Sequence, residues 1–282
     1  MIERFEADWL ALREPFDHAA RSIALARRLA ERLPARPRLV DFGAGTGSMF
    51  RFLAPIIARR QDWLLIDADA ALLDESFGRT AAWGRARGYA ATSSGDELLL
   101  STPVGLWRMQ IVTTAPPPLA GGGRGEGALP PTSDADAIVC SALLDLVSAS
   151  WLEHLFDTLT IPFLACLTVD GRDAWHPRHP SDAAVRTAFR RDQHRDKGFG
   201  RALGPTAPSF ALRALAERGF VTASAPSDWR IPRNALRMQR ALIEGRGAGD
   251  PQWQAARLRQ AMRGRLAIAI GHRDILAFPP GG

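Results

Sequence analysis

The apolar positions of the chain switch repeatedly between helical and extended spacing. Residues 5–33 carry apolar side chains at mostly helical spacing, and Pro15 is expected to break this segment into two helices. Residues 38–42 form a short apolar run that ends in glycines, which predicts a buried strand. A helix is expected to begin at residues 48–54 and to kink or end at Pro55.

The same switching continues to the end of the chain. Further strands are predicted at residues 63–67, 106–114, 136–140, 163–169 and 220–225, with a last strand or hairpin at 265–278. Further helices are predicted at residues 70–79, 151–158, 182–193, 205–219, 234–244 and 251–262. Residues 81–101 give no clear pattern, and the prolines and glycines of residues 115–133 predict a flexible loop. Strands that alternate with helices predict a parallel, doubly wound sheet with helices on both faces.

Length and composition agree with one large α/β domain. The chain has 282 residues, of which 46% are apolar, so it can bury a sizeable core. Its 36 basic residues comprise Lys197 and 35 arginines, and the net charge is only +6. The basic character is therefore mostly a preference for arginine, and it gives little support to a nucleic-acid partner.

Cysteine content and hydropathy exclude several other classes. Cys140 and Cys166 lie in apolar runs, which favours buried free thiols over a disulfide framework or a cysteine-rich zinc site. The first residues lack the basic-then-apolar order of a signal peptide, and no apolar run is long enough to span a membrane. We expect a soluble, cytoplasmic protein.

The most informative motif is a glycine loop. The sequence Asp-Phe-Gly-Ala-Gly-Thr-Gly at residues 41–47 follows a predicted strand and precedes a predicted helix. Glycines at such a turn permit positive φ and let a ligand approach the backbone, while amide groups at the helix start face it. A dinucleotide-binding loop would have its third glycine at Ser48, which argues against a nicotinamide oxidoreductase. Asp67 ends the next predicted strand, where a carboxylate can accept both hydroxyls of a ribose.

Here the chain resembles the class I S-adenosylmethionine-dependent methyltransferases. The resemblance rests on the acid and glycine loop at residues 41–47, the acid at Asp67, and a looser match at residues 136–145. It covers residues 36–170 by motif and the rest by element order. It implies a seven-stranded, mostly parallel sheet with an antiparallel last strand and an N-terminal helical extension. The fold alone, with a glycine turn and no ligand, is the competing interpretation.

The resemblance also implies a set of cofactor-binding residues. Asp41 would organise the loop and the cofactor's amino group, Asp67 would hold the ribose, and Ala68 would lie beside the adenine. The whole implied set is Arg21, Asp41, Gly43, Ala44, Gly45, Gly47, Asp67, Ala68, Ser141 and Leu143. The family often has an acid after the third strand, whereas this chain has Thr113 and Thr114 there, with Asp96 as a more distant substitute.

The acceptor is expected beside the segment that follows the fifth predicted strand. Residues 194–200 are dense in reactive groups, and His194 is a candidate general base because its ordinary pKa is near ~6.5. Lys197 and Arg195 could hold a carboxylate or phosphate, and Asp145 lies on the same rim of the sheet. A solvated surface loop explains residues 194–200 about as well.

Three other clusters favour structural explanations. His176 and His179 lie in a proline-containing loop without further ligands, so no metal is expected. Arg13, Asp17 and Arg21 share one helix face, which suits a surface ion-pair ladder, although Arg21 could meet a cofactor carboxylate. Nine arginines between residues 230 and 265 face only Glu244 and Asp250, and a solvated helix pair is the expected explanation.

We therefore expect one domain, residues 1–282, with S-adenosyl-L-methionine as cofactor and a small-molecule acceptor. Within it, residues 1–36 would form a helical cap, 37–170 the cofactor-binding half, and 171–282 the substrate-side insertion and C-terminal half. The predicted catalytic residues are His194, Asp145 and Lys197. An RNA methyltransferase that uses the basic C-terminal helices, and a non-catalytic cofactor-binding protein, are the alternatives.

Overall fold

The structure is a computed structural model that describes residues 6–114, 134–247 and 249–281. The loop expected at residues 115–133 lies outside the described residues. The strands are β1 (Arg38–Phe42), β2 (Gln61–Asp67), β3 (Ala90–Ser94), β4 (Glu97–Thr102), β5 (Gly105–Thr113), β6 (Ala137–Ser141), β7 (Phe163–His176), β8 (Val221–Pro226), β9 (Trp229–Ile231) and β10 (Ala267–Phe278). The α-helices are α1 (Ala7–Ala20), α2 (Ile23–Arg32), α3 (Ser48–Ile57), α4 (Ala70–Arg85), α5 (Ala149–Thr158), α6 (Asp182–Gln193), α7 (Ala207–Glu217), α8 (Leu236–Arg246) and α9 (Pro251–Met262), and η1 (Gly204–Thr206) is a short 3-10 turn.

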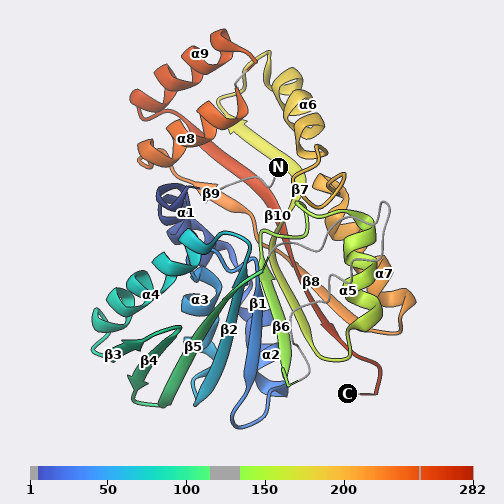
Figure 1. Ribbon diagram of the computed structural model, residues 1–282. Coiled ribbons are helices and arrows are strands. Elements are labelled where there is room, and N and C mark those ends of the chain that lie inside the picture. Colours follow the sequence, from blue (N-terminus) through green and yellow to red (C-terminus); the bar gives the residue numbers. More distant parts are fainter. Residues whose placement is uncertain (1–5, 115–133, 248, 282) are drawn as a thin grey trace.

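One twisted sheet organises the molecule (Figure 1), and its strand order is β3-β4-β5-β2-β1-β6-β7-β10-β8, with β9 added beside β10. Strands β5, β2, β1, β6 and β7 run parallel, while β10 is antiparallel to both β7 and β8. The predicted doubly wound, mostly parallel sheet with an antiparallel last strand is confirmed.

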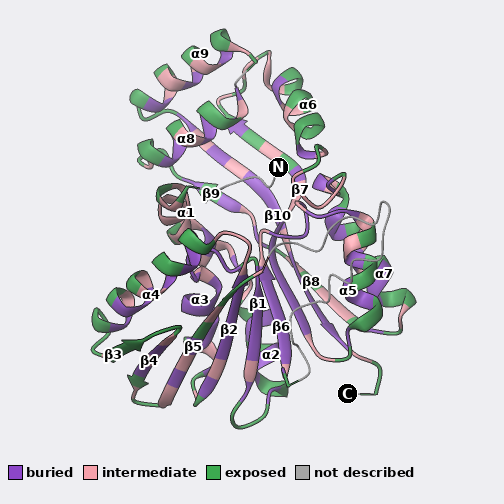
Figure 2. Cartoon of the chain, in the orientation of Figure 1, coloured by how far each residue is buried: buried purple, intermediate pink, exposed green. Residues whose placement is uncertain are grey.

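Helices cover both faces of this sheet. One apolar cluster contains the buried faces of α2, α3 and α4, and the other contains those of α5 and α7. The central strands are therefore buried on both sides, as the purple colouring in Figure 2 shows. This double burial explains why residues 38–42 and 137–141 are almost continuously apolar instead of alternating.

The structure adds strands to the seven that were expected. The described part of the sheet has ten, because residues 81–101 contribute β3 and β4 and a short β9 precedes α8. Strand β7 also continues seven residues beyond the predicted end at Val169, to His176, so the boundary expected at residue 170 falls inside a strand. The upper halves of β7 and β10 carry β9, α6, α8 and α9 beyond the main sheet (Figure 1).

The break in the first helical segment is not at Pro15. Pro15 lies inside α1, and the chain turns instead at Arg21 and Ser22. The Ser22 hydroxyl accepts the Leu25 N–H as the cap of α2, and the Ser22 N–H donates to Asp274 Oδ2 at 2.7 Å. The cap and its contact with β10 end α1, whereas proline only removes one donor from it. Similarly, α3 continues through Pro55 to Ile57.

Candidate functional site

The glycine loop joins β1 to α3 at the carboxyl end of the sheet. Gly43, Gly45 and Gly47 all have positive φ, at 66°, 51° and 81°. A Cβ at Gly45 would stand 3.2 Å from the Leu10 side chain of α1, and one at Gly43 would stand 3.2 Å from Leu143. The loop conformation expected from the sequence is present, and α1 and the segment after β6 pack closely against it.

Asp41 lies beneath this loop and is the second-last residue of β1. Its side chain is fully buried, and neither carboxylate oxygen accepts a hydrogen bond from a described residue. Burial raises its pKa well above the usual range, the charge of Arg21 opposes this rise, and Asp67 reinforces it. A buried carboxyl group without partners is costly, and therefore points to a ligand or water that completes the site.

Arg21 reaches the same place from the turn between α1 and α2. It is buried, and it donates to the Ser48 carbonyl at 3.3 Å, to the Ser48 hydroxyl at 3.2 Å and to the Ser141 hydroxyl at 2.9 Å. No described residue accepts a hydrogen bond from its Nε. Two of the residues assigned to the cofactor from the sequence, Arg21 and Ser141, are therefore in direct contact although 120 residues separate them.

Asp67 fastens the glycine loop to the end of β2. Its Oδ2 accepts the Gly45 N–H at 2.7 Å, and its Oδ1 accepts the Asp69 N–H at 2.9 Å. Burial raises the pKa of Asp67, and the backbone N–H groups of Asp69, Gly45 and Ala68 work against that rise. A carboxylate has about four acceptor positions, so these backbone bonds leave it capacity to accept from a ligand.

The third parallel strand, β5, ends at Thr113, which lies beside Asp67 in register. The hairpin between β3 and β4 brings Asp96 to this strand, because the Ile111 N–H donates to the Asp96 carbonyl at 3.4 Å. Asp96, which is distant from Thr113 in the sequence, therefore lies near the carboxyl end of β5, and it is exposed.

Asp145 lies on the rim that follows β6. It is only 7% exposed, and its Oδ1 has no hydrogen-bond partner among the described residues. Burial raises its pKa to about 6, and the charges of Lys197 and Arg13 partly oppose the rise. A carboxyl group in this range can both take and release a proton near neutral pH.

The chain directly after the reactive segment at residues 194–200 is tied to the same rim. The Leu203 N–H donates to the Val147 carbonyl at 2.9 Å, and the Gly204 N–H donates to the Asp145 carbonyl at 3.0 Å. Lys197 is half-buried and close enough to Asp145 to influence its pKa. The structure thus brings the predicted residues Asp145 and Lys197 together.

His194 lies in the same segment but is held by its neighbours. Its Nδ1 lies 3.1 Å from the Ala202 carbonyl, and its ring stands beside Gly204, where an added Cβ would meet it at 3.2 Å. Because a carbonyl oxygen only accepts, Nδ1 is the donor in this contact, and Nε2 is left able to accept a proton. Arg195 is exposed and pairs with Asp192.

The ion-pair ladder expected on the surface of α1, from Arg13, Asp17 and Arg21, is not there. Asp17 is 4% exposed and accepts hydrogen bonds from Arg13 and from Trp229 Nε1, at 3.0 and 2.9 Å. Arg21 bends away to Ser48 and Ser141 instead of joining a ladder. Helical spacing could not reveal this arrangement, because Trp229 lies 212 residues further along the chain.

The basic C-terminal helices divide into buried and exposed arginines. Arg246 pairs with Asp173, and Arg257 is fully buried between Trp175 and Trp253 with Asp182 as its partner. The other seven arginines of residues 230–265 are exposed, at positions 230, 233, 237, 240, 259, 263 and 265. They give the outer end of the molecule a basic surface.

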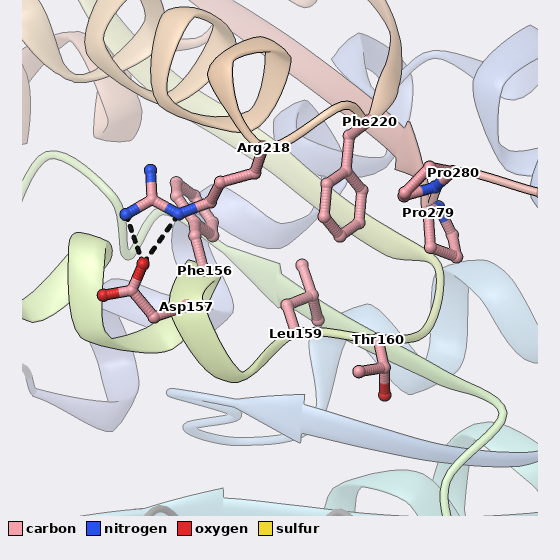
Figure 3. Close-up of a pocket in the computed structure, with 8 residues that line it drawn as sticks. All are labelled: Phe156, Asp157, Leu159, Thr160, Arg218, Phe220, Pro279 and Pro280. Carbon is pink, nitrogen blue, oxygen red and sulfur yellow. Dashed lines mark hydrogen bonds and ion pairs between the residues drawn. The ribbon is translucent and has the colours of Figure 1, made fainter.

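A hollow also lies at the opposite end of the sheet (Figure 3). It is lined by Phe156, Leu159, Phe220 and the last prolines, with Arg218 and Asp157 paired at 2.9 Å on its rim. These residues precede β7 and β8 or follow β10, far from the glycine loop.

Within the described residues, no group of three or more His, Cys, Asp or Glu could hold a metal, and no helix is long and apolar enough to cross a membrane.

Comparison with protein-family models gives no match, and comparison with curated proteins gives none either. Several solved structures are similar. A SAM-dependent methyltransferase from Thiobacillus denitrificans, solved with S-adenosyl-L-homocysteine, is 15% identical with a TM-score of 0.42, covering 97% of this chain and 99% of that chain.

Two further structures have comparable values. Geranyl diphosphate C-methyltransferase from Streptomyces coelicolor is 14% identical with a TM-score of 0.39, covering 90% of this chain and 76% of that one. The [4+2]-cyclase SpnF is 14% identical with a TM-score of 0.40, covering 92% and 82%. Likenesses this distant assign no role to any residue of this chain.

Proposed function

We propose that the protein transfers a methyl group from S-adenosyl-L-methionine to a small-molecule acceptor. The observation that carries this proposal is the carboxyl group of Asp41, which is fully buried beneath the glycine loop with neither oxygen bonded to a described residue. Other buried polar atoms of the described chain also have no partner, but Asp41 lacks one at both of its oxygens. A buried carboxyl group of this kind is costly unless a ligand or water satisfies it.

The residues at this end fit the proposed cofactor. The turn at residues 43–47 offers positive-φ glycines and the start of α3 to the methionine portion. Asp41 and Arg21 suit its amino and carboxylate groups, and the remaining acceptor capacity of Asp67 suits a ribose diol. Ala68, Ser141 and Leu143 would form the walls. When bound, the cofactor supplies an electrophilic methyl group on a sulfonium.

The chain's own task is to hold the acceptor in line and to manage its proton. Proximity can supply most of the rate enhancement for such a transfer. Asp145 would accept the proton of an O–H or N–H acceptor, and the nearby charge of Lys197 favours its ionised form. The loop that is anchored through Gly204 closes this side of the site.

Binding of S-adenosyl-L-homocysteine tests the cofactor assignment. In isothermal titration calorimetry we expect Asp67→Ala and Asp41→Asn to weaken binding about tenfold or more, because each removes a carboxyl group that would bind the cofactor. Asp62→Ala is the matched control, since Asp62 is a half-exposed residue near the opposite end of the same strand, β2. No binding to the unmodified protein, or equal affinities for all three variants, would overturn the proposal.

The seven exposed arginines favour RNA as a second candidate acceptor. RNA binding through them would weaken steeply as salt increases, because each phosphate contact releases counterions. A mobility-shift titration of RNA fragments at two salt concentrations decides this point. Absence of binding at low salt excludes the RNA candidate and leaves the small-molecule proposal unchanged.

A further inference from the structure

A buried polar cluster joins α1 to the last strands, β9 and β10. Asp17 Oδ1 accepts Trp229 Nε1 at 2.9 Å, and Asp17 Oδ2 accepts Arg13 Nε at 3.0 Å. The Arg13 guanidinium lies 4.8 Å above the Trp229 ring, whose centroid is 4.9 Å from that of His272. Each member restrains another, so the guanidinium is held in one orientation.

Arg13 uses only part of its hydrogen-bonding capacity. A guanidinium has five N–H donors, yet within the described ranges only Nε of Arg13 has an acceptor, which is Asp17. The buried Arg51 is different, because its Nε and both terminal nitrogens bond to Glu14, Thr46 and Thr80. The Arg13 side chain is 12% exposed and is held by its ion pair with Asp17. Its four terminal N–H donors have no acceptor among the described residues.

The position of Arg13 places these donors beside the proposed acceptor. Arg13 lies on the same face of α1 as Arg21, whose guanidinium reaches Ser141 at the end of β6. Through Trp229 it also lies near His272 of β10, which pairs with Val169 of β7. Burial lowers the pKa of His272 to about 3, so this neighbour is neutral and adds no second positive charge.

We propose that Arg13 binds an acid group of the acceptor, and that the acceptor is a small carboxylic acid. This inference rests on the proposed function. The planar fork of arginine matches a carboxylate through two parallel hydrogen bonds. Asp17 and Asp145 lie nearby, and their charges suit a singly charged carboxylate better than a doubly charged phosphate.

The test compares small carboxylic acids with their primary amides, which have nearly the same shape without the charge. Benzoate and benzamide, and phenylacetate and phenylacetamide, are titrated into the protein saturated with S-adenosyl-L-homocysteine. We expect the acids to bind at least about tenfold more tightly than the amides, and Arg13→Gln to remove that preference. Arg27→Gln, an exposed arginine of α2, is the control and keeps the preference.

A second variant and the binding of S-adenosyl-L-homocysteine complete the test. If Arg13→Gln fails to fold, Asp17→Asn leaves Arg13 in place and removes the nearest competing carboxylate, so acid affinity should rise. Equal affinity for acids and amides, no binding of any acid, or an acid preference that survives in Arg13→Gln, overturns the inference. If S-adenosyl-L-homocysteine binds in the Asp67-dependent way while these outcomes occur, only the acceptor assignment fails.

Discussion

Asp145 is a buried acidic residue whose ionisation costs stability. Its carboxyl group is buried beside apolar neighbours, with one oxygen unpartnered, although an asparagine would fit the same space without a charge. Burial holds its pKa near 6, against the charges of Lys197 and Arg13. Perturbed acids of this kind concentrate at functional sites, and they cost stability whenever they ionise.

Because ionised Asp145 destabilises the folded chain, the free energy of unfolding should depend on pH. The pKa of Asp145 is about 6 in the folded chain and about 3.9 in an unfolded one, so the folded state binds the proton more tightly. Stability is therefore lost as pH rises from about 4 to about 6, by up to about 3 kcal/mol. We expect Asp145→Asn to unfold at higher urea concentration than the unmodified protein at pH 8, by about 1–3 kcal/mol.

The comparison at pH 4 is the control for this prediction, because Asp145 is then protonated in the folded chain and the stability difference should be small. Turnover should rise with pH through about 6 and be lost in Asp145→Asn. An equal stability difference at both pH values would show that the substitution acts through packing instead.

Among the helices, α1 packs against the glycine loop, and an ion pair between Glu14 and Arg51 attaches it to α3. Glu14 accepts two hydrogen bonds from Arg51, at 2.7 and 2.6 Å, and Arg51 also holds the Thr46 carbonyl in the glycine loop. Burial raises the pKa of Glu14, but the bonds to Arg51 outweigh this and leave the pKa below its usual value. The pair therefore stabilises the chain above that pKa and weakens as acid protonates Glu14.

We expect Glu14→Ala to lower the free energy of unfolding by about 2–3 kcal/mol, because it leaves the buried Arg51 without its counter-charge. Amide hydrogen exchange in α1 and in residues 43–47 should accelerate together. Glu75→Ala is the control, since it breaks an exposed pair with Arg79 in α4 and should cost no more than about 0.5 kcal/mol. Equal losses for the two variants would contradict a role of the Glu14 pair in holding α1.

At the scale of the whole molecule, β7 and β10 make the outer end continuous with the main sheet. The two strands pair along nearly their whole lengths, and β9, α6, α8 and α9 are built around their outer halves (Figure 1). Asp173 lies in this outer half of β7, is almost fully buried, and pairs with Arg246 and Arg186 at 3.0 Å each. Burial lowers the pKa of Arg246 to about 10, and Asp173 opposes the fall.

We expect Asp173→Ala to destabilise the entire chain by about 3 kcal/mol, because it strands a buried arginine charge. Shared strands should keep unfolding cooperative, so circular dichroism and tryptophan fluorescence should report coincident transitions at lower temperature. Asp192→Ala, which breaks an exposed pair with Arg195, is the control and should shift neither transition measurably. A separate early transition in the Asp173 variant would show that the outer end unfolds alone.

The sequence by itself determined the features that depend on neighbours along the chain. Residues 38–47 predict a buried strand followed by a positive-φ glycine turn, and the structure has both, because strand patterning and glycine conformation are local properties. The alternation of strands and helices similarly fixed the doubly wound sheet. Residues 81–101 gave no pattern because they join the end of α4 to the edge strand β3, which has no buried position, and to β4, which buries only Leu98 and Leu100.

Which side chains meet at the candidate site depends on long-range packing, and could be read only from the tertiary structure. Asp145 and Lys197 approach each other, Arg21 reaches Ser141, and Asp17 meets Trp229 across 212 residues. The burial of Asp17 and Arg13, which the sequence placed on the surface, comes from the packing of β9 on α1. Such contacts arise from chain topology and long-range packing, and these leave no periodic signal in the sequence.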